Sequence, residues 1–388
     1  NQKLINQVFS KCDLFLSEEK KDLKMSTVSR VLSYKLLLVH VSSDASKSVL
    51  DSALDKIHEL AINSREAFVK HGVNVLQPLE QLAIVEDSWC CKDVVMKNTY
   101  WVILRVFASS PKNTEAVYQF ISSIIKEHPT LIEYDNYMDI LGLLDEISAV
   151  GAYGAQWEHE YDKLIDSGLK VEVNKNPYQE LVNIALQSIT LTSQLGDVIN
   201  GTSFAKSTEE KKASGAEVVN PWYPLIEAIS HQCYNPCRQL RNHALNTLTN
   251  LLITNPKLPL KELSLEKMLD AACLRLLVEL MKPEVNGTDV KGMIKTQRDV
   301  LGLSCKMILT FDFSNVEAVV DKVFAVSSQL LQKNRASYPN SGHEDEVIEL
   351  LRNVLMIKKD KLDLVKLKGY KMDGALKKLV EEVIKSNA

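Results

Sequence analysis

Residues 316–324 read Val-Glu-Ala-Val-Val-Asp-Lys-Val-Phe, and this stretch indicates the fold class. Its apolar residues recur three and four positions apart, at Val316, Val319, Val320, Val323 and Phe324. Because a helix has about 3.6 residues per turn, these side chains line one face of an amphipathic helix. The same spacing returns in residues 240–252 and 375–384. The best strand-like alternation, at 362–364, is too short to carry a sheet.

Residues that start and stop helices support the same fold class. Asn176 before Pro177 predicts a helix start, because Asn is a favoured N-cap and Pro is favoured at the first helical position. Gly196 predicts the end of that helix. Asn220 and Pro221 predict another helix start of the same kind.

The chain divides into two predicted helical blocks. Residues 201–219 are rich in Gly, Ser, Lys and Glu, a composition typical of an exposed linker. We therefore predict a helical block at 1–196, a linker at 197–220 and a second helical block at 221–388. A further polar stretch, 332–345, predicts a loop inside the second block.

Neighbouring helical hairpins of about 40 residues match the spacing of HEAT and armadillo repeats. The sequence therefore predicts an all-α, HEAT/armadillo-like helical solenoid, in which each hairpin packs on the next. An irregular helical bundle is the alternative, because the hairpins do not align into a strict repeat.

Composition narrows the class of protein. The chain has 388 residues, 45% of them hydrophobic and 25% charged, so an ordered globular protein is expected. The net charge of −4 argues against a general nucleic-acid binder, which usually has a basic bias. Seven cysteines in a long, core-rich chain favour a reducing, cytosolic compartment over a disulfide framework. The start at Asn1, without an initiator Met, is expected of a piece of a longer chain.

Few sequence motifs indicate a catalytic, cofactor-binding or metal-binding site. The sequence contains neither a phosphate-binding loop nor a dinucleotide-binding turn, and we predict no cofactor, metal or catalytic residue. A cluster of possible zinc ligands is the exception: His231, Cys233, Cys237 and His243. Its spacing matches no common zinc finger, so two small buried cysteines are the favoured interpretation. A metal-dependent helical enzyme remains an alternative hypothesis.

Residues 358–378 hold eight lysines and three aspartates, a local charge of +5. Such a run can contact anionic lipid headgroups or a partner, and Lys366, Lys368 and Lys371 are the candidate contacts. A solvated helix face is the favoured alternative, because runs of charge usually need no partner.

One motif in the second block resembles a known family. Residues 222–229 read Trp-Tyr-Pro-Leu-Ile-Glu-Ala-Ile, and a Cys, two Arg and an Ala-Leu pair follow at regular spacing. This pattern resembles the large Golgi Arf guanine-nucleotide exchange factors of the fungal Gea and animal GBF class. The residues that carry it are Trp222, Pro224, Leu225, Arg238, Arg241, Ala244 and Leu248. Physically, Trp222 and Leu225 should be buried, and Arg241 should reach a carboxylate or carbonyl groups at a helix end.

The resemblance implies a regulatory role in vesicle-mediated transport. The chain would correspond to the second and third helical regions downstream of the exchange module, which is not recognisable here. It would be cytosolic, associate peripherally with Golgi membranes through the parent protein, and receive small GTPases of the Arf or Rab type. Homodimer contacts would lie mostly upstream, outside this chain. A HEAT-type adaptor or transport scaffold unrelated to Arf exchange is the alternative within binding proteins.

Overall fold

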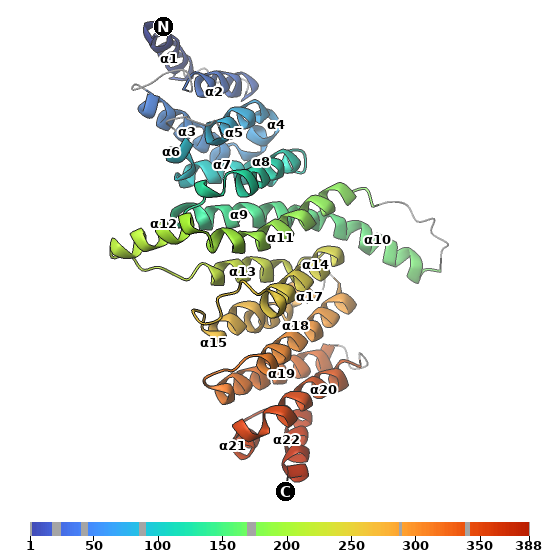
Figure 1. The fold of residues 1–388 in the computed structure, drawn as a ribbon. Helices are drawn as coiled ribbons and strands as arrows, with labels where there is room; N and C mark the ends of the chain where they lie inside the picture. Colours follow the sequence, from blue (N-terminus) through green and yellow to red (C-terminus); the bar gives the residue numbers. More distant parts are fainter. Residues whose placement is uncertain are drawn as a thin grey trace. The chain divides into compact units, whose positions relative to one another are not determined.

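The computed structural model describes residues 2–17, 25–39, 46–84, 91–168, 176–286, 289–337 and 342–387. Within these residues all regular structure is helical, and there is no β-strand. Several pairs of consecutive helices contact each other as antiparallel neighbours, such as α13 (Trp222–Gln232) with α14 (Arg238–Thr249) and α18 (Val290–Thr310) with α19 (Val316–Ser337) (Figure 1). The predicted all-α solenoid is confirmed.

Contacts group the chain into two units. The first unit comprises residues 1–150 and 183–218, and the second comprises 151–182 and 219–388. Helix α11 (Gln179–Ile199) therefore contributes its first residues to the second unit and the rest to the first.

The first unit is built around aromatic side chains on α7. Trp101 is fully buried and donates its indole N–H to the Val95 carbonyl at 2.7 Å, and buried Tyr100 donates its hydroxyl to the Leu79 carbonyl at 2.9 Å. These bonds satisfy the polar groups that the buried rings carry. Besides α11, the helices of this unit are α1 (Gln2–Ser17), α2 (Met25–Val39), α3 (Ser46–Asn63), α4 (Arg65–His71), α5 (Leu76–Ile84), α6 (Cys91–Val95), α7 (Asn98–Ala108), α8 (Thr114–Glu127), α9 (Tyr134–Val150) and α12 (Thr202–Ala213).

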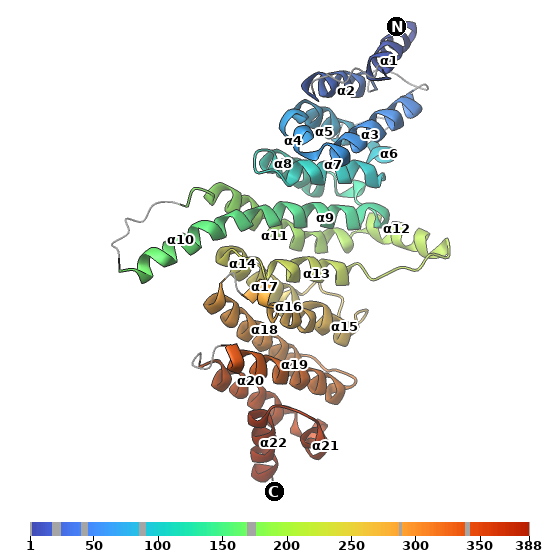
Figure 2. The same ribbon diagram turned by 180° about the vertical axis from the view of Figure 1, so that it is seen from behind.

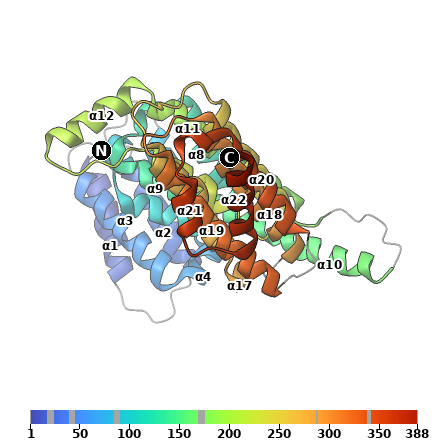
Figure 3. The ribbon, with the colours of Figure 1, turned by 90° about the horizontal axis from the view of Figure 1, so that it is seen from below.

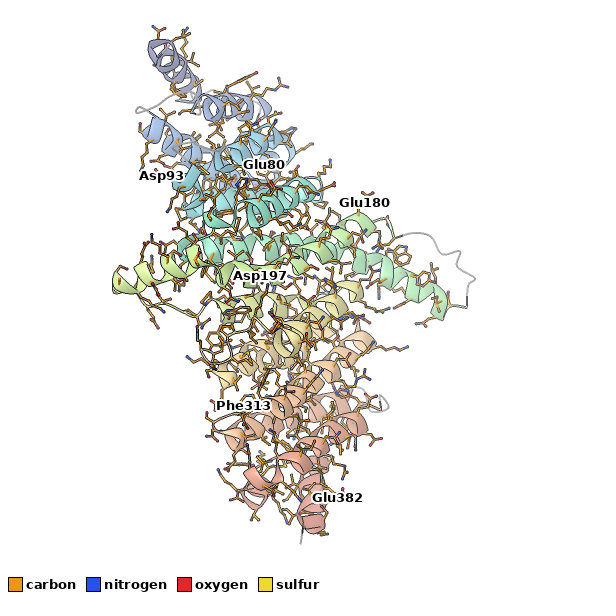
Figure 4. All side chains as sticks on the ribbon, viewed as in Figure 1. Glu80, Asp93, Glu180, Asp197, Phe313 and Glu382 are labelled. Atoms are coloured by element: carbon orange, nitrogen blue, oxygen red, sulfur yellow. The ribbon has the colours of Figure 1, made fainter. Side chains whose placement is uncertain are left out.

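The second unit continues in chain order from α13 to α22, as the reverse view in Figure 2 also shows. Its last helices are joined at the surface, where Glu382 on α22, labelled in Figure 4, accepts a hydrogen bond from Arg352 on α20 at 3.2 Å. The helices of this unit are α10 (Gly154–Asp166), α13 (Trp222–Gln232), α14 (Arg238–Thr249), α15 (Leu265–Leu269), α16 (Arg275–Leu280), α17 (Pro283–Asn286), α18 (Val290–Thr310), α19 (Val316–Ser337), α20 (His343–Lys358), α21 (Leu364–Gly369) and α22 (Gly374–Asn387).

The predicted asparagine caps form, although each helix begins one or two residues later than expected. The Asn176 side chain accepts from the Tyr178 N–H at 2.9 Å, and α11 begins at Gln179. The Asn220 side chain accepts from the Trp222 N–H at 3.1 Å, and α13 begins at Trp222.

Gly196 does not end α11, contrary to the prediction. The helix continues to Ile199, and both Leu195 and Ile199 are buried. A glycine inside a helix costs about 1 kcal/mol relative to alanine. Burying an aliphatic side chain contributes about 1.5–3 kcal/mol, which is enough to carry the helix past the glycine.

Part of the predicted linker is helical. Residues 202–213 form α12, and residues 216–220 have no regular structure. Phe204 anchors this helix, although the segment is polar in composition. Its side chain is 2% exposed, and its ring packs edge-on against the Tyr137 ring with the two ring centroids 5.4 Å apart. The limits of the two predicted blocks, at 196 and 221, stay a prediction.

The predicted loop at 332–345 is wrong for its described residues. Helix α19 runs to Ser337 and α20 begins at His343, whereas residues 338–341 lie outside the described ranges. Asn334 is buried and donates to the Gln297 side-chain oxygen at 2.8 Å. Its polarity alone predicts a loop residue, but inside the core a hydrogen bond satisfies the polar side chain.

Trp222→Ala should destabilise the second unit. Trp222 is 2% exposed at the start of α13, and truncating a buried aromatic side chain typically costs about 3–5 kcal/mol. Chemical denaturation followed by circular dichroism measures the loss. Trp157→Ala, at a half-buried tryptophan on α10, is the matched control and should cost clearly less. Equal losses for the two variants would contradict this prediction.

Candidate functional site

The apolar motif residues lie inside the second unit. Leu225 on α13 and Ala244 and Leu248 on α14 are fully buried, and Pro224 is half-buried in the first turn of α13. Helices α13 and α14 contact each other through these faces. These residues therefore form the packing between two neighbouring helices.

Arg241 is a buried cation on α14. It is 1% exposed, and one of its terminal nitrogens donates to the carbonyls of Asn235 and Pro236 at 2.8 and 2.9 Å. The other terminal nitrogen donates to the Asp289 carboxylate. A buried charge is costly unless it is paired and hydrogen-bonded, and Arg241 meets both conditions.

Asp289 connects three elements through one carboxylate. It lies directly before α18 and caps that helix by accepting from the Gly292 N–H at 3.2 Å. It pairs with Arg241, and Arg238 donates to both of its oxygens, at 2.7 and 3.0 Å. The two-pronged contact with Arg238 is the geometry in which a guanidinium binds a carboxylate most strongly.

Arg238 extends the cluster to helix α10. Its side chain also donates to Asp162 of α10, and its backbone N–H donates to Glu158 of the same helix at 2.9 Å. We call Arg238, Arg241, Asp289, Glu158 and Asp162 the arginine–carboxylate cluster. It joins α10, α14 and the start of α18 within the second unit.

The charges in this cluster fix the protonation states of Asp289 and Arg238. Burial alone would raise the pKa of Asp289, but the hydrogen bonds and charges of Arg238 and Arg241 outweigh it and lower the pKa below the ordinary 3.8. Hydrogen bonds to Asp289 and Asp162 raise the pKa of Arg238. Both residues therefore stay charged at neutral pH.

The absence of a side chain at Gly292 leaves space for the Asp289 carboxylate and the Arg241 guanidinium. A β-carbon built at this position would lie 2.5 Å from a terminal nitrogen of Arg241 and would clash with the Asp289 carboxylate. A residue with any side chain would displace one of the two paired groups.

A groove of about 570 Å³ lies beside the cluster, between α10 and the start of α18. Charged residues of both signs line it: Glu158, Asp162, Lys163, Asp166, Arg238, Asp289, Lys291 and Lys295. A mixed lining of this kind suits a polar segment of a protein better than an apolar small molecule.

The two cysteines of the possible zinc-ligand cluster, Cys233 and Cys237, have different surroundings. The Cys233 thiol donates to the Ile229 carbonyl at 3.6 Å, whereas the Cys237 thiol donates to Glu158 at 3.5 Å. Burial, together with the charge of Glu158, raises the pKa of Cys237 to about 11, so the thiol stays protonated. Across the described part of the chain, no group of three or more His, Cys, Asp or Glu side chains is arranged to hold a metal ion.

The candidate lysines lie on and beside α21, and acidic side chains from other helices face them. Lys366 pairs with Glu317 of α19 at 2.6 Å, and Lys368 pairs with Glu381 of α22 at 3.1 Å. Lys371 is exposed. A role for these lysines in lipid or partner contact stays a prediction.

Sequence reasoning found the two arginines of the cluster but not their carboxylates. Asp289 lies 48 residues after Arg241, and Asp162 lies 76 residues before Arg238. One local signal for Asp289 exists, because an Asp directly before a helix is a favoured N-cap. Glu158 and Asp162 carry no comparable signal.

The motif-bearing part of the second unit matches a protein family. Residues 222–385 match the family described as "GBF1-like, tetratrico peptide repeat region". This match covers α13 to α22 almost completely, and it describes the helical repeats as tetratricopeptide repeats.

Two yeast proteins are similar to a larger part of the chain. ARF guanine-nucleotide exchange factor 2 of Saccharomyces cerevisiae is 31% identical over 270 residues, which is 68% of this chain and 17% of the yeast protein. ARF guanine-nucleotide exchange factor 1 of the same yeast is 26% identical over 258 residues, 65% of this chain and 17% of its own length. The chain thus resembles a C-terminal helical region of a large Arf exchange factor, as the motif predicted.

Asp289→Ala should destabilise the second unit strongly. Removing one partner of a buried ion pair typically costs about 3–5 kcal/mol, because the other charge stays buried and unpaired. Asp299→Ala is the control: Asp299 pairs with Arg298, both side chains are 32% exposed, and a surface pair contributes about 0–1 kcal/mol. Urea denaturation of both variants measures the difference.

The pH dependence adds a second readout for Asp289. The pKa of Asp289 is lower in the folded chain than in the unfolded chain. The contribution of Asp289 to stability is therefore complete above its pKa in the unfolded chain, and it is lost as the pH falls through its pKa in the folded chain. The unfolding free energy of the unmodified chain should therefore fall more steeply below about pH 4 than that of Asp289→Ala. Parallel curves for the two proteins would contradict the proposed ion pair.

Gly292→Ala should also destabilise the second unit, by displacing Asp289 or Arg241. Gly302→Ala is the matched control on the same helix, because a β-carbon there would meet its nearest atoms at an ordinary 3.9 Å. It should be neutral or stabilise the chain by up to about 1 kcal/mol, since alanine favours the helix. Thermal melting of both variants tests the contrast, which would fail if both lowered the melting temperature equally.

Proposed function

We propose that this chain is a non-catalytic regulatory region of a large Arf guanine-nucleotide exchange factor acting in Golgi vesicle trafficking. The chain binds and orients partners and helps to recruit the parent protein to membranes. The similarity to two yeast Arf exchange factors supports this proposal, and the chain spans 17% of the length of each.

The arginine–carboxylate cluster is the observation that carries the proposal. In the matched family region, Arg241 is buried and both arginines are bound to carboxylates, so they hold helices together. The apolar motif residues are buried as well. The motif thus maintains the scaffold, and partner recognition is left to the outer surfaces of its helices, as in other solenoids.

The proposed partners are small GTPases of the Arf or Rab type, together with Golgi membranes reached through the parent protein. Association with the membrane would be peripheral, from the cytosol. Within the described residues, no helix is both long and apolar enough to cross a membrane. Nucleotide exchange and the homodimer contacts of the parent would belong to regions outside this chain.

The isolated chain should not accelerate nucleotide release from an Arf GTPase. It should, however, bind a GTP-loaded small GTPase of the Arf or Rab type more strongly than the GDP-loaded form. Release of a fluorescent nucleotide measures the first expectation, with an Arf exchange module as the positive control. Pull-down of purified, loaded GTPases measures the second. A rate enhancement by the chain alone would contradict a non-catalytic role, and equal or absent retention of both forms would contradict the proposed partners.

A further inference from the structure

A groove in the first unit is formed by two separate segments of the chain. One wall is α4 with Val73 just beyond its end, and the other is the connection between α7 and α8. The groove has a volume of about 700 Å³. Its lining consists of Arg65, Glu66, Val69, Lys70, Val73, Ser109, Ser110, Lys112 and Asn113. We call it the α4–α8 groove.

The two walls are held together by contacts between α4 and the end of α7. The Phe68 and Phe107 rings are both fully buried, and their centroids lie 4.9 Å apart. Arg65 donates a hydrogen bond to the Ser109 hydroxyl at 2.8 Å. The groove is therefore formed before any partner binds, so that little binding free energy is lost in ordering it.

The charge of the groove is mainly positive. Lys70 and Lys112 are exposed, one on each wall, and neither forms an ion pair with any residue that the structure describes. Arg65 adds a third cation, although its guanidinium lies 3.9 Å from the Glu146 carboxylate. The lining contains a single acidic residue, Glu66. Positive charge is thus left uncompensated on both walls.

Several lysines elsewhere in the first unit are paired within the chain. Lys92 pairs with Glu133 at 2.7 Å, and Lys97 pairs with Asp51 at 2.8 Å. The chain as a whole has a net charge of −4, so much of its surface repels an anionic ligand that the groove attracts. The uncompensated charge of the groove therefore indicates an anionic partner.

The groove also offers apolar and hydroxyl groups. Val73 is 49% exposed, and Val69 is half-buried. The half-buried Ser109 and Ser110 lie on the opposite wall. The lining therefore suits a segment that combines carboxylates with an aliphatic side chain.

This lining favours a protein segment over a membrane or a nucleic acid. Helices that bind membranes bury a continuous apolar face at the headgroup boundary, whereas the two valines here lie within a groove. Proteins that bind single-stranded nucleic acid stack its bases on aromatic side chains. None of the described residues that line the groove is aromatic.

We propose that the α4–α8 groove binds an acidic segment of a partner protein. The carboxylates of the segment contact Lys70 and Lys112, and one of its aliphatic side chains packs against Val69 and Val73. A single segment forms a small interface, so the binding is weak, and it weakens further as salt screens the charges. The groove lies outside residues 222–385, which match the family, and such binding is independent of the GTPase partners proposed above.

Fluorescence anisotropy of the full chain with a labelled peptide tests the proposal. The probe is a short peptide of Glu and Asp around one central Leu, and its counterpart has Lys at every acidic position. The unmodified chain should bind the acidic peptide and not the basic one. Lys70→Glu with Lys112→Glu should weaken the binding of the acidic peptide about a hundredfold, about tenfold for each lysine, because each reversal replaces an attractive contact with a repulsive one.

A second charge reversal is the matched control. Lys206→Glu with Lys212→Glu changes the net charge by the same amount at two exposed residues of α12. Figure 3 shows α12 on the opposite side of the first unit from α4. This variant should bind the acidic peptide as the unmodified chain does.

The basic peptide separates a change of specificity from a loss of fold. The variant Lys70→Glu with Lys112→Glu should bind the basic peptide, which an unfolded groove would not do. An acidic peptide that does not bind the unmodified chain, or equal losses of affinity in the two double variants, would overturn the proposal. Binding of phosphatidylserine vesicles through Lys70 and Lys112 without binding of the peptide would overturn it in favour of a membrane surface.

Discussion

The guanidinium of Arg241 is a charge held almost entirely away from water, and the second unit is organised around that constraint. A buried cation requires an anion and further hydrogen-bond acceptors. Asp289 supplies the anion, and the carbonyls of Asn235 and Pro236 supply acceptors between α13 and α14. Because the same carboxylate also caps α18, the position of that helix is tied to the charge on α14.

This constraint reaches the surface through Arg238. The residue shares Asp289 with Arg241 but is itself partly exposed, and it binds the acidic face of α10. An amphipathic helix would ordinarily bury its apolar side. The aromatic residues of α10, Trp157 and Tyr161, are accordingly half-buried, and Arg238 binds Glu158 and Asp162 on the adjoining side of the helix. The buried charge thus also sets which contacts hold α10 to the unit.

Charge at the other end of the unit follows the same principle of pairing across helices. The lysine-rich segment has a local charge of +5 in the sequence, but Asp312, Glu317 and Glu381, which lie outside that segment, pair with Lys361, Lys366 and Lys368. Together with these three carboxylates, the lysine-rich segment has a net charge of +2. Exposed ion pairs of this kind contribute little to stability, but they remove most of the field that would attract an anionic surface.

The sequence by itself determined the helices and the residues that line their buried faces, because helical periodicity and capping are local properties. The stripes at 316–324 and 240–252, the caps at Asn176 and Asn220, and the burial of Trp222 could all be predicted from neighbouring residues. Local signals gave the wrong prediction at Gly196, Phe204 and Asn334, because packing against distant residues decided the structure there.

The partners of Arg238 and Arg241 were decided only by the tertiary structure. Asp162 and Asp289 lie tens of residues away in the chain, and no periodicity or spacing connects them to α14. For the same reason the contacts of Glu158 and Asp162 on α10 could not be assigned in advance, since nothing near them in the chain signals an arginine partner.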